Sequence, residues 1–130
     1  RGEYDMEWFR SHGVRPEQMS DLEKSVENIG KKIGENEWDL RLRFVKWSVR
    51  FQTPGGRNAF IIMVRKTQNH HLRFVLGPNF DPSSVKMSTE VRKKLKHRKS
   101  TSRWWQLPLE TNFIDEYQPL LEAAYEIVGQ

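Results

Sequence analysis

Residues 38–51 read W-D-L-R-L-R-F-V-K-W-S-V-R-F, and this stretch decides the fold class. Its apolar residues occupy alternate positions from Trp38 to Phe44 and again, in the opposite phase, from Val45 to Phe51. Alternation with a period of two is typical of strands that bury one face. The change of phase predicts either a bulge or a turn between two short strands.

Two further strands follow this stretch, each after a turn. Residues 53–58 have the composition of a turn, and residues 59–64 are mostly apolar on both faces, which predicts a central strand. A second turn over residues 67–70 precedes a predicted strand at residues 71–76. Short connections between successive strands favour an antiparallel meander.

A helix is predicted before the strands. The apolar residues between positions 19 and 33 recur at helical spacing: Met19, Leu22, Val26, Ile29 and Ile33. Ser20 and Glu23 have the spacing of a capping box, which predicts a firm start at Asp21, and Gly34 is the predicted end.

A second helix is predicted at the end of the chain, with its buried side chains between residues 120 and 128. Asp115 and Gln118 form another capping-box pattern, and Gly129 is the predicted end. A third, short helix is expected over residues 3–11.

The chain between the meander and the last helix is strongly basic. Ser88 or Thr89 can cap a short helix that extends to about His97, and Val91 with Leu95 would hold it to the core. We expect a mobile hinge over residues 100–102. A strand over residues 103–109 should follow, and Pro108 implies that this strand lies at an edge of the sheet or contains a bulge.

These elements predict an α+β fold with a three- to four-stranded, mainly antiparallel sheet and flanking helices, in the order α-β-β-β-α-β-α. The 130 residues suffice for one hydrophobic core. Residues 1–14 are expected to form a tail or arm, and residues 15–130 a single domain. Because the first residue is Arg1 rather than Met, we expect this chain to be part of a longer protein.

The charge distribution is the main indication of function. Between Leu40 and Leu109 there are sixteen Lys and Arg residues and two acids, Asp81 and Glu90, so this region carries a net charge of +14. The flanking regions carry −9, and the whole chain carries +5. A basic middle between acidic ends predicts a polyanionic partner.

Strand alternation predicts where part of this charge lies. If Trp47, Val49 and Phe51 face the helix, Lys46 and Arg50 face the other side of the sheet. Outer faces of antiparallel sheets are ordinarily polar. A polar outer face does not explain why its charged residues are positive rather than mixed, because bases on neighbouring strands repel one another. An anion-binding surface is therefore predicted.

The basic run from Arg92 to Arg103 lies beside Trp104 and Trp105. Lys and Arg neutralise phosphates, and aromatic rings stack on unpaired bases. Adjacent Trp residues on a strand face opposite ways, so at least one of the two should lie in the core. The predicted nucleic-acid-binding residues are Arg41, Arg43, Lys46, Arg50, Arg73, Arg92, Lys93, Lys94, Lys96, Arg98, Lys99, Arg103 and Trp104.

No catalytic motif, cofactor site or metal site is predicted. The chain lacks Cys, which removes disulfides and thiolate ligands and fits the cytoplasm. His70 and His71 are adjacent in a predicted turn, which is unsuited to a zinc pair, and both are expected to be exposed. Residues 53–57 lack the Lys and Ser or Thr of a phosphate loop. No apolar run is long enough for a membrane span.

The predicted element order resembles the core of the restriction-endonuclease-like fold. That superfamily holds Mg²⁺ with clustered carboxylates and an acid-x-Lys element, and the nearest match here, Asp39-Leu-Arg41, lacks the Lys. An active nuclease would have to use a degenerate site, and Glu37, Asp39 and Asp81 are the carboxylates near the sheet.

From Ser20 onward the chain also resembles a small domain-of-unknown-function family found at the C-terminus of restriction-type and HNH-nuclease-type defence proteins; stand-alone members are labelled predicted transport proteins. The resemblance rests on residues 22–34, 44–51, 58–60 and 120–129. It implies a helix-flanked α+β sheet and a companion role beside a nuclease or similar effector. It offers no catalytic residue, and the basic insert at residues 86–103 departs from the pattern.

Two functions from different classes follow from these observations. The favoured one is a non-catalytic module that binds DNA or RNA within a larger defence or DNA-processing protein. The alternative is a protein-interaction module whose basic face docks an acidic partner domain, with Trp8, Phe9 and the Trp104-Trp105 pair as anchors. Oligomeric state is not predicted.

Overall fold

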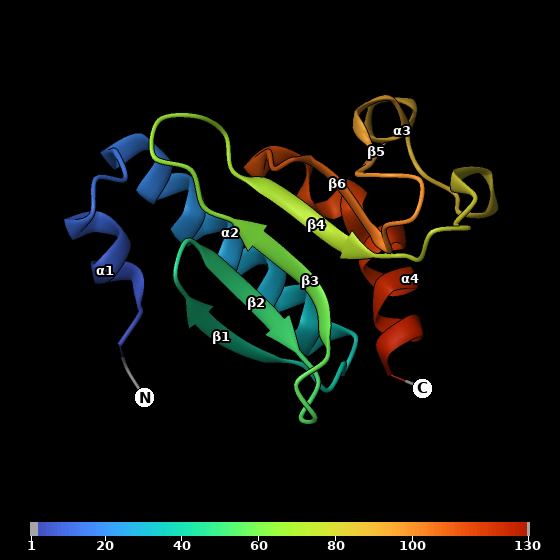
Figure 1. The fold of residues 1–130 in the computed structure, drawn as a ribbon, viewed down its shortest axis with the longest axis horizontal. Coiled ribbons are helices and arrows are strands. Elements are labelled where there is room, and N and C mark those ends of the chain that lie inside the picture. The colour runs from blue at the N-terminus through green and yellow to red at the C-terminus, as the bar shows by residue number, and fades with distance from the viewer. Residues whose placement is uncertain (1–2, 130) are drawn as a thin grey trace.

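The computed structural model describes residues 3–129. Its elements, shown in Figure 1, are α1 (Met6–Ser11), α2 (Pro16–Glu35), β1 (Arg41–Val45), β2 (Ser48–Gln52), β3 (Asn58–Met63), β4 (His71–Val75), the 3₁₀ helix η1 (Pro82–Ser84), α3 (Thr89–Lys94), β5 (Lys96–His97), β6 (Trp104–Pro108), the 3₁₀ helix η2 (Thr111–Tyr117) and α4 (Gln118–Val128).

The strands form one sheet in the order β1-β2-β3-β4-β6-β5, and each neighbouring pair is antiparallel. The predicted α+β class and the antiparallel meander are therefore confirmed. The predicted number of three to four strands is wrong, because six strands are present, and the predicted element order is wrong for the same reason. The additional strands arise because a turn divides residues 38–51 into β1 and β2, and because the two-residue β5 has too short a pattern to predict.

The change of phase at Phe44–Val45 is a turn between two strands, one of the two predicted alternatives. Val45 pairs with Ser48, so Lys46 and Trp47 alone connect β1 to β2. Trp47 has a φ of +60°, in the left-handed region, which a non-glycine residue adopts at some cost in tight turns. The hairpin removes Lys46 from the strand face on which it was expected.

The predicted helix over residues 88–97 is shorter than expected. Its cap is confirmed, since Ser88 Oγ accepts a hydrogen bond from the Val91 N–H at 3.2 Å. Helix α3 ends at Lys94, however, and Leu95 has extended backbone. The next two residues pair with β6 as strand β5. Leu95 reaches the core from this extended backbone, so the apolar pair Val91–Leu95 did not require a continuing helix.

The two predicted capping boxes do not exist. Helix α2 already begins at Pro16, with Arg15 as N-cap, and the Arg15 N–H donates to the Lys66 carbonyl at 3.0 Å. Ser20 therefore lies inside the helix, which also continues one residue past Gly34. Asp115 lies inside η2, whose turns lead directly into α4.

The core lies between one face of the sheet and the helices α2 and α4, and α2 runs behind the strands in Figure 1. Phe60 of β3 is fully buried; its ring centroid is 5.5 Å from that of Phe51 and 6.3 Å from that of Trp38. Trp38 in turn stacks on Tyr125 of α4. The expected arm is packed on this core, because Phe9 of α1 is fully buried and contacts other core aromatics.

His70 is a correction to the sequence prediction, since its side chain is only 1% exposed. Its Nδ1 accepts a hydrogen bond from the Arg65 N–H at 2.9 Å, and its Nε2–H donates to the Gln18 carbonyl at 2.8 Å. This single neutral tautomer joins the loop after β3 to α2. His70 is therefore a buried structural residue.

Burial lowers the pKa of His70 below its ordinary value, so the folded protein holds the ring neutral. The unfolded chain binds a proton below about pH 6.5, where the folded one does not, and the free energy of unfolding should fall as the pH drops below that value. Urea denaturation at pH 7.5 and pH 5.0 measures this loss. His70→Gln should reduce the difference between the two pH values.

Candidate nucleic-acid interface

The face of the sheet opposite the helices carries a row of cations. Residues that pair across neighbouring strands project to the same face, and the registers align six of them across the sheet. In strand order they are Arg43, Arg50, Ile61, Arg73, Gln106 and Lys96. We call Arg43, Arg50, Arg73 and Lys96 the basic row. Neighbouring strands lie about 4.8 Å apart, so these bases cross the sheet at intervals of one or two strands.

An apolar residue lies at the centre of the basic row. Ile61, between Arg50 and Arg73, is only 7% exposed. Arg73 Nε donates to Gln106 Oε1 at 3.0 Å, which fixes the guanidinium at the middle of the row. Arg50 Nε is buried and has no hydrogen-bond partner in the structure. Both central cations are thus partly desolvated, and Arg73 is also held in place by Gln106.

Positive charge is concentrated here without compensation from the strands. No strand residue that shares this face through the described registers is acidic. Burial lowers the pKa of Arg73 from its ordinary value, and repulsion from the nearby Arg98 lowers it further. A bound anion would relieve that repulsion.

Several predicted residues lie around the row. Arg41 pairs with Gln52 and shares the face of Arg43 at the outer strand. Lys46 lies exposed in the β1–β2 turn, away from the row. Arg92 and Lys93 are exposed on α3, and Arg98 and Lys99 are exposed after β5.

Lys94 is engaged within the protein. Its Nζ donates to Glu110 Oε2 at 2.5 Å and lies 5.0 Å from the centroid of the Phe113 ring. The hydrogen bond to Glu110 raises the pKa of Lys94, which is therefore charged in the folded protein. Lys94 ties α3 to the chain after β6, and binding a phosphate would require it to give up this carboxylate.

The two Trp residues of β6 face opposite ways, as alternation predicts. Trp105 lies on the helix side, where His97 stacks on it at 4.2 Å and its Nε1–H donates to the Gly77 carbonyl at 2.8 Å. Trp104 is half-buried on the open face, and the Arg103 guanidinium lies 5.8 Å from its ring centroid. Only Trp104 is therefore placed to meet a ligand on the open face.

The expected hinge at residues 100–102 is a turn closed by hydrogen bonds. The Ser102 N–H donates to the Lys99 carbonyl at 2.9 Å, and Ser102 Oγ accepts from the Trp104 N–H at 3.0 Å. His97 Nε2 also contacts the Ser102 carbonyl. These bonds fix the direction in which the basic run returns to the sheet.

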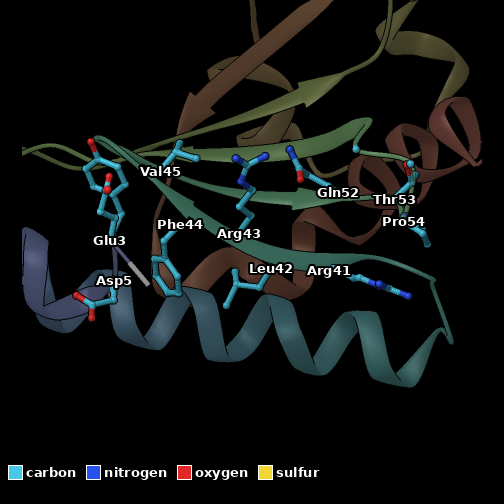
Figure 2. Close-up of a pocket in the computed structure, with 13 residues that line it drawn as sticks. Glu3, Asp5, Arg41, Leu42, Arg43, Phe44, Val45, Gln52, Thr53 and Pro54 are labelled. Carbon is cyan, nitrogen blue, oxygen red and sulfur yellow. The ribbon is translucent and has the colours of Figure 1, made fainter. Parts of the chain in front are cut away.

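A second concave region, shown in Figure 2, runs along the outer edge of β1. This edge groove has a volume of about 880 Å³ and is lined by residues 3–5, β1 and the turn at residues 52–56. Leu42 and Phe44 point toward α2, while Arg43 points to the open face. The groove contains both bases and the acids Glu3 and Asp5, so its charge is mixed.

The carboxylates considered for a nuclease lie at separate strands of the sheet. Glu37 and Asp39 precede β1, and Asp81 follows β4, so two strands lie between them. Within residues 3–129, no group of three His, Asp or Glu side chains is arranged to hold a metal ion. Over the same residues, no helix has the length and apolar character that crossing a membrane requires.

Comparison with known proteins gives no relative: no protein-family model, no curated protein and no solved structure matches the chain.

Sequence reasoning missed two polar residues of the open face. Gln106 pairs with Arg73 and Lys96, and His71 pairs with Pro108 on the same side. The signal was present in the alternation, because Gln106 has the parity of Trp104 and His71 has the parity of Arg73. Register was the missing information, since it depends on how β6 pairs with β4 across a connection of 28 residues.

Proposed function

We propose that this chain is a non-catalytic nucleic-acid-binding module that holds phosphates along the open face of its sheet. The basic row is the observation that carries the proposal. It spans from the first to the last strand of the sheet, the Arg73 guanidinium is held by Gln106, and no acid of the described strands interrupts it. Fixed cations on an extended surface neutralise successive phosphates and release their counterions.

The exposed bases of the Arg92–Arg103 run extend this surface beyond the sheet. Arg98 approaches Arg73, and Lys96 belongs to the basic row itself. A ligand on the row would therefore reach the run without a gap. Specificity for sequence should be weak, because the cations are suited to phosphates and few fixed donors face a base edge. We place the module within a larger defence or DNA-processing protein, in keeping with the resemblance.

Fluorescence anisotropy with labelled 15-nucleotide DNA and RNA, single- and double-stranded, across 50–300 mM salt tests this function. We expect affinity to fall steeply with salt, with a slope set by the number of phosphates contacted. Absence of binding at the lowest salt would refute the proposal. The positive charge would then be better explained by an acidic protein partner.

The interaction-module alternative loses three of its four anchors in this structure. Phe9 is fully buried in the protein's own core, and Trp8 packs against Trp47 and stacks on His12. Trp105 is likewise in the core. The nucleic-acid function is therefore favoured over a protein-docking role that depends on these aromatics.

A further inference from the structure

A small pocket lies where strand β5 ends beside β6. It has a volume of about 300 Å³, and its wall is almost entirely apolar. Leu107 and Pro108 contribute to it from β6, His71 from β4, and three lysines, Lys93, Lys94 and Lys96, from α3 and β5. We call it the lysine pocket. Its size is at the lower end of the range for small-ligand sites.

The pocket exists because β5 is only two residues long. Lys96 and His97 pair with Gln106 and Trp105, so β6 has no strand partner on that side at Pro108. Proline has no N–H to offer, and this unpaired edge is where it is tolerated. Lys94 is held by Glu110 at the border of the gap, which keeps α3 in position and leaves Lys93 and Lys96 exposed.

The lysine pocket is continuous with the basic row. Lys96 belongs to both, and Gln106, which accepts the hydrogen bond from Arg73, also lines the pocket. A phosphate chain lying on the row would therefore pass directly over an apolar hollow with cations at its border. The ligand that satisfies both features has an anionic backbone and a planar apolar group beside it.

We infer that the lysine pocket receives one unpaired base of a single-stranded nucleic acid, with the adjoining phosphates on Lys93 and Lys96. This inference rests on the proposed function and names its ligand class. A duplex keeps its base faces stacked inside the helix, so it cannot place one against Pro108 without extruding it. Bases of a single strand are free to do so, and protein surfaces hold them by ring contact beside cations.

His71 supports this assignment. Burial, followed by the nearby Arg65 and Arg73, lowers the pKa of its ring. The imidazole is therefore neutral near pH 7, adds no charge to the pocket, and presents a flat surface to a base. Arginines and lysines supply the charge, and His71 with Pro108 supplies the ring contacts.

The test compares two single strands that have the same number of phosphates. One is a labelled 12-nucleotide DNA, and the other is the same length built from abasic tetrahydrofuran units. A third ligand is the blunt duplex of the first sequence. The strand with bases should bind about tenfold more tightly than the abasic strand at the same salt, and more tightly than the duplex.

Two variants locate the base contact. His71→Ala and Pro108→Ala remove the ring contacts without changing the number of cations, and the Pro108→Ala backbone N–H would face the unpaired edge of β6. Each should reduce the ratio of base-containing to abasic affinity by threefold or more, while abasic-strand affinity stays within twofold. Lys31→Ala, at an exposed position of α2 that lines neither the lysine pocket nor the row, should change neither quantity.

The outcomes separate the two proposals. Equal affinity for base-containing and abasic strands would overturn the base pocket and leave phosphate binding intact. An unchanged ratio in both His71→Ala and Pro108→Ala, with circular dichroism showing the native fold, would also overturn it, because the base would dock elsewhere. If the wild-type protein binds none of the three ligands, the proposed function itself is refuted.

Discussion

The triple variant Arg43→Gln, Arg73→Gln and Lys96→Gln should lose about a hundredfold in affinity for single-stranded nucleic acid at 0.1 M salt. Each phosphate contact on a single strand contributes about 0.7 to the slope of log affinity against log salt, so three contacts contribute about 2. The slope itself should become shallower by about 2. Arg50 is left in place because its Nε is buried and its loss would disturb the sheet.

The matched control removes the same charge from the other side of the molecule. Arg15→Gln, Lys24→Gln and Lys31→Gln change exposed residues at the start and along the outer surface of α2. This variant should keep the wild-type slope and lose less than threefold in affinity. If the two triple variants weaken binding equally, net charge alone attracts the ligand and the basic row has no special role.

Phe60→Ala should lower the free energy of unfolding by about 3–5 kcal/mol, which is the usual effect of truncating a fully buried aromatic side chain. Phe60 is 0% exposed and links the Phe51 ring on the sheet to Trp38, which stacks on α4. Its removal leaves a cavity between the sheet and the helices. Urea denaturation followed by circular dichroism measures the change.

Leu42→Ala is the comparison for Phe60→Ala. Leu42 projects from the same face of the sheet but lies on the outer strand and is 45% exposed. Its truncation should therefore cost less than about 1 kcal/mol. Similar losses for both variants would show that the centre of the sheet is not where the stabilising contacts are concentrated.

Long periodic segments were predictable from the sequence, because one dominant force determines each of them. Burial of alternating apolar residues determined the β1–β4 meander, and burial at helical spacing determined α2 and α4. The predictions from capping patterns were wrong where another interaction determined the residue at which the helix begins. At α2 this was the Arg15–Lys66 hydrogen bond, which links segments 51 residues apart.

The site was predicted only in part. Alternation placed Arg50 on the face away from the helix without any structure. The alignment of the basic row with Gln106 required the pairing of β6 with β4 and β5, which is a tertiary property. Strand β5 follows a capped helix and has only two residues. Its pattern is too short for local propensity to predict a strand.

The outer strand β1 also bears on how the protein behaves at high concentration. The Val64 N–H donates to the Trp47 carbonyl, so this carbonyl is directed toward β3 and not toward β1. The bonding direction alternates along the hairpin, and the main-chain N–H and C=O groups of Leu42 and Phe44 are therefore directed away from β2, toward the outer edge of the sheet. An unpaired edge of this kind can be extended by the same strand of another molecule. Arg41 and Arg43 on β1 oppose such stacking by electrostatic repulsion, so bases assigned here to ligand contact also help to keep separate molecules from aggregating.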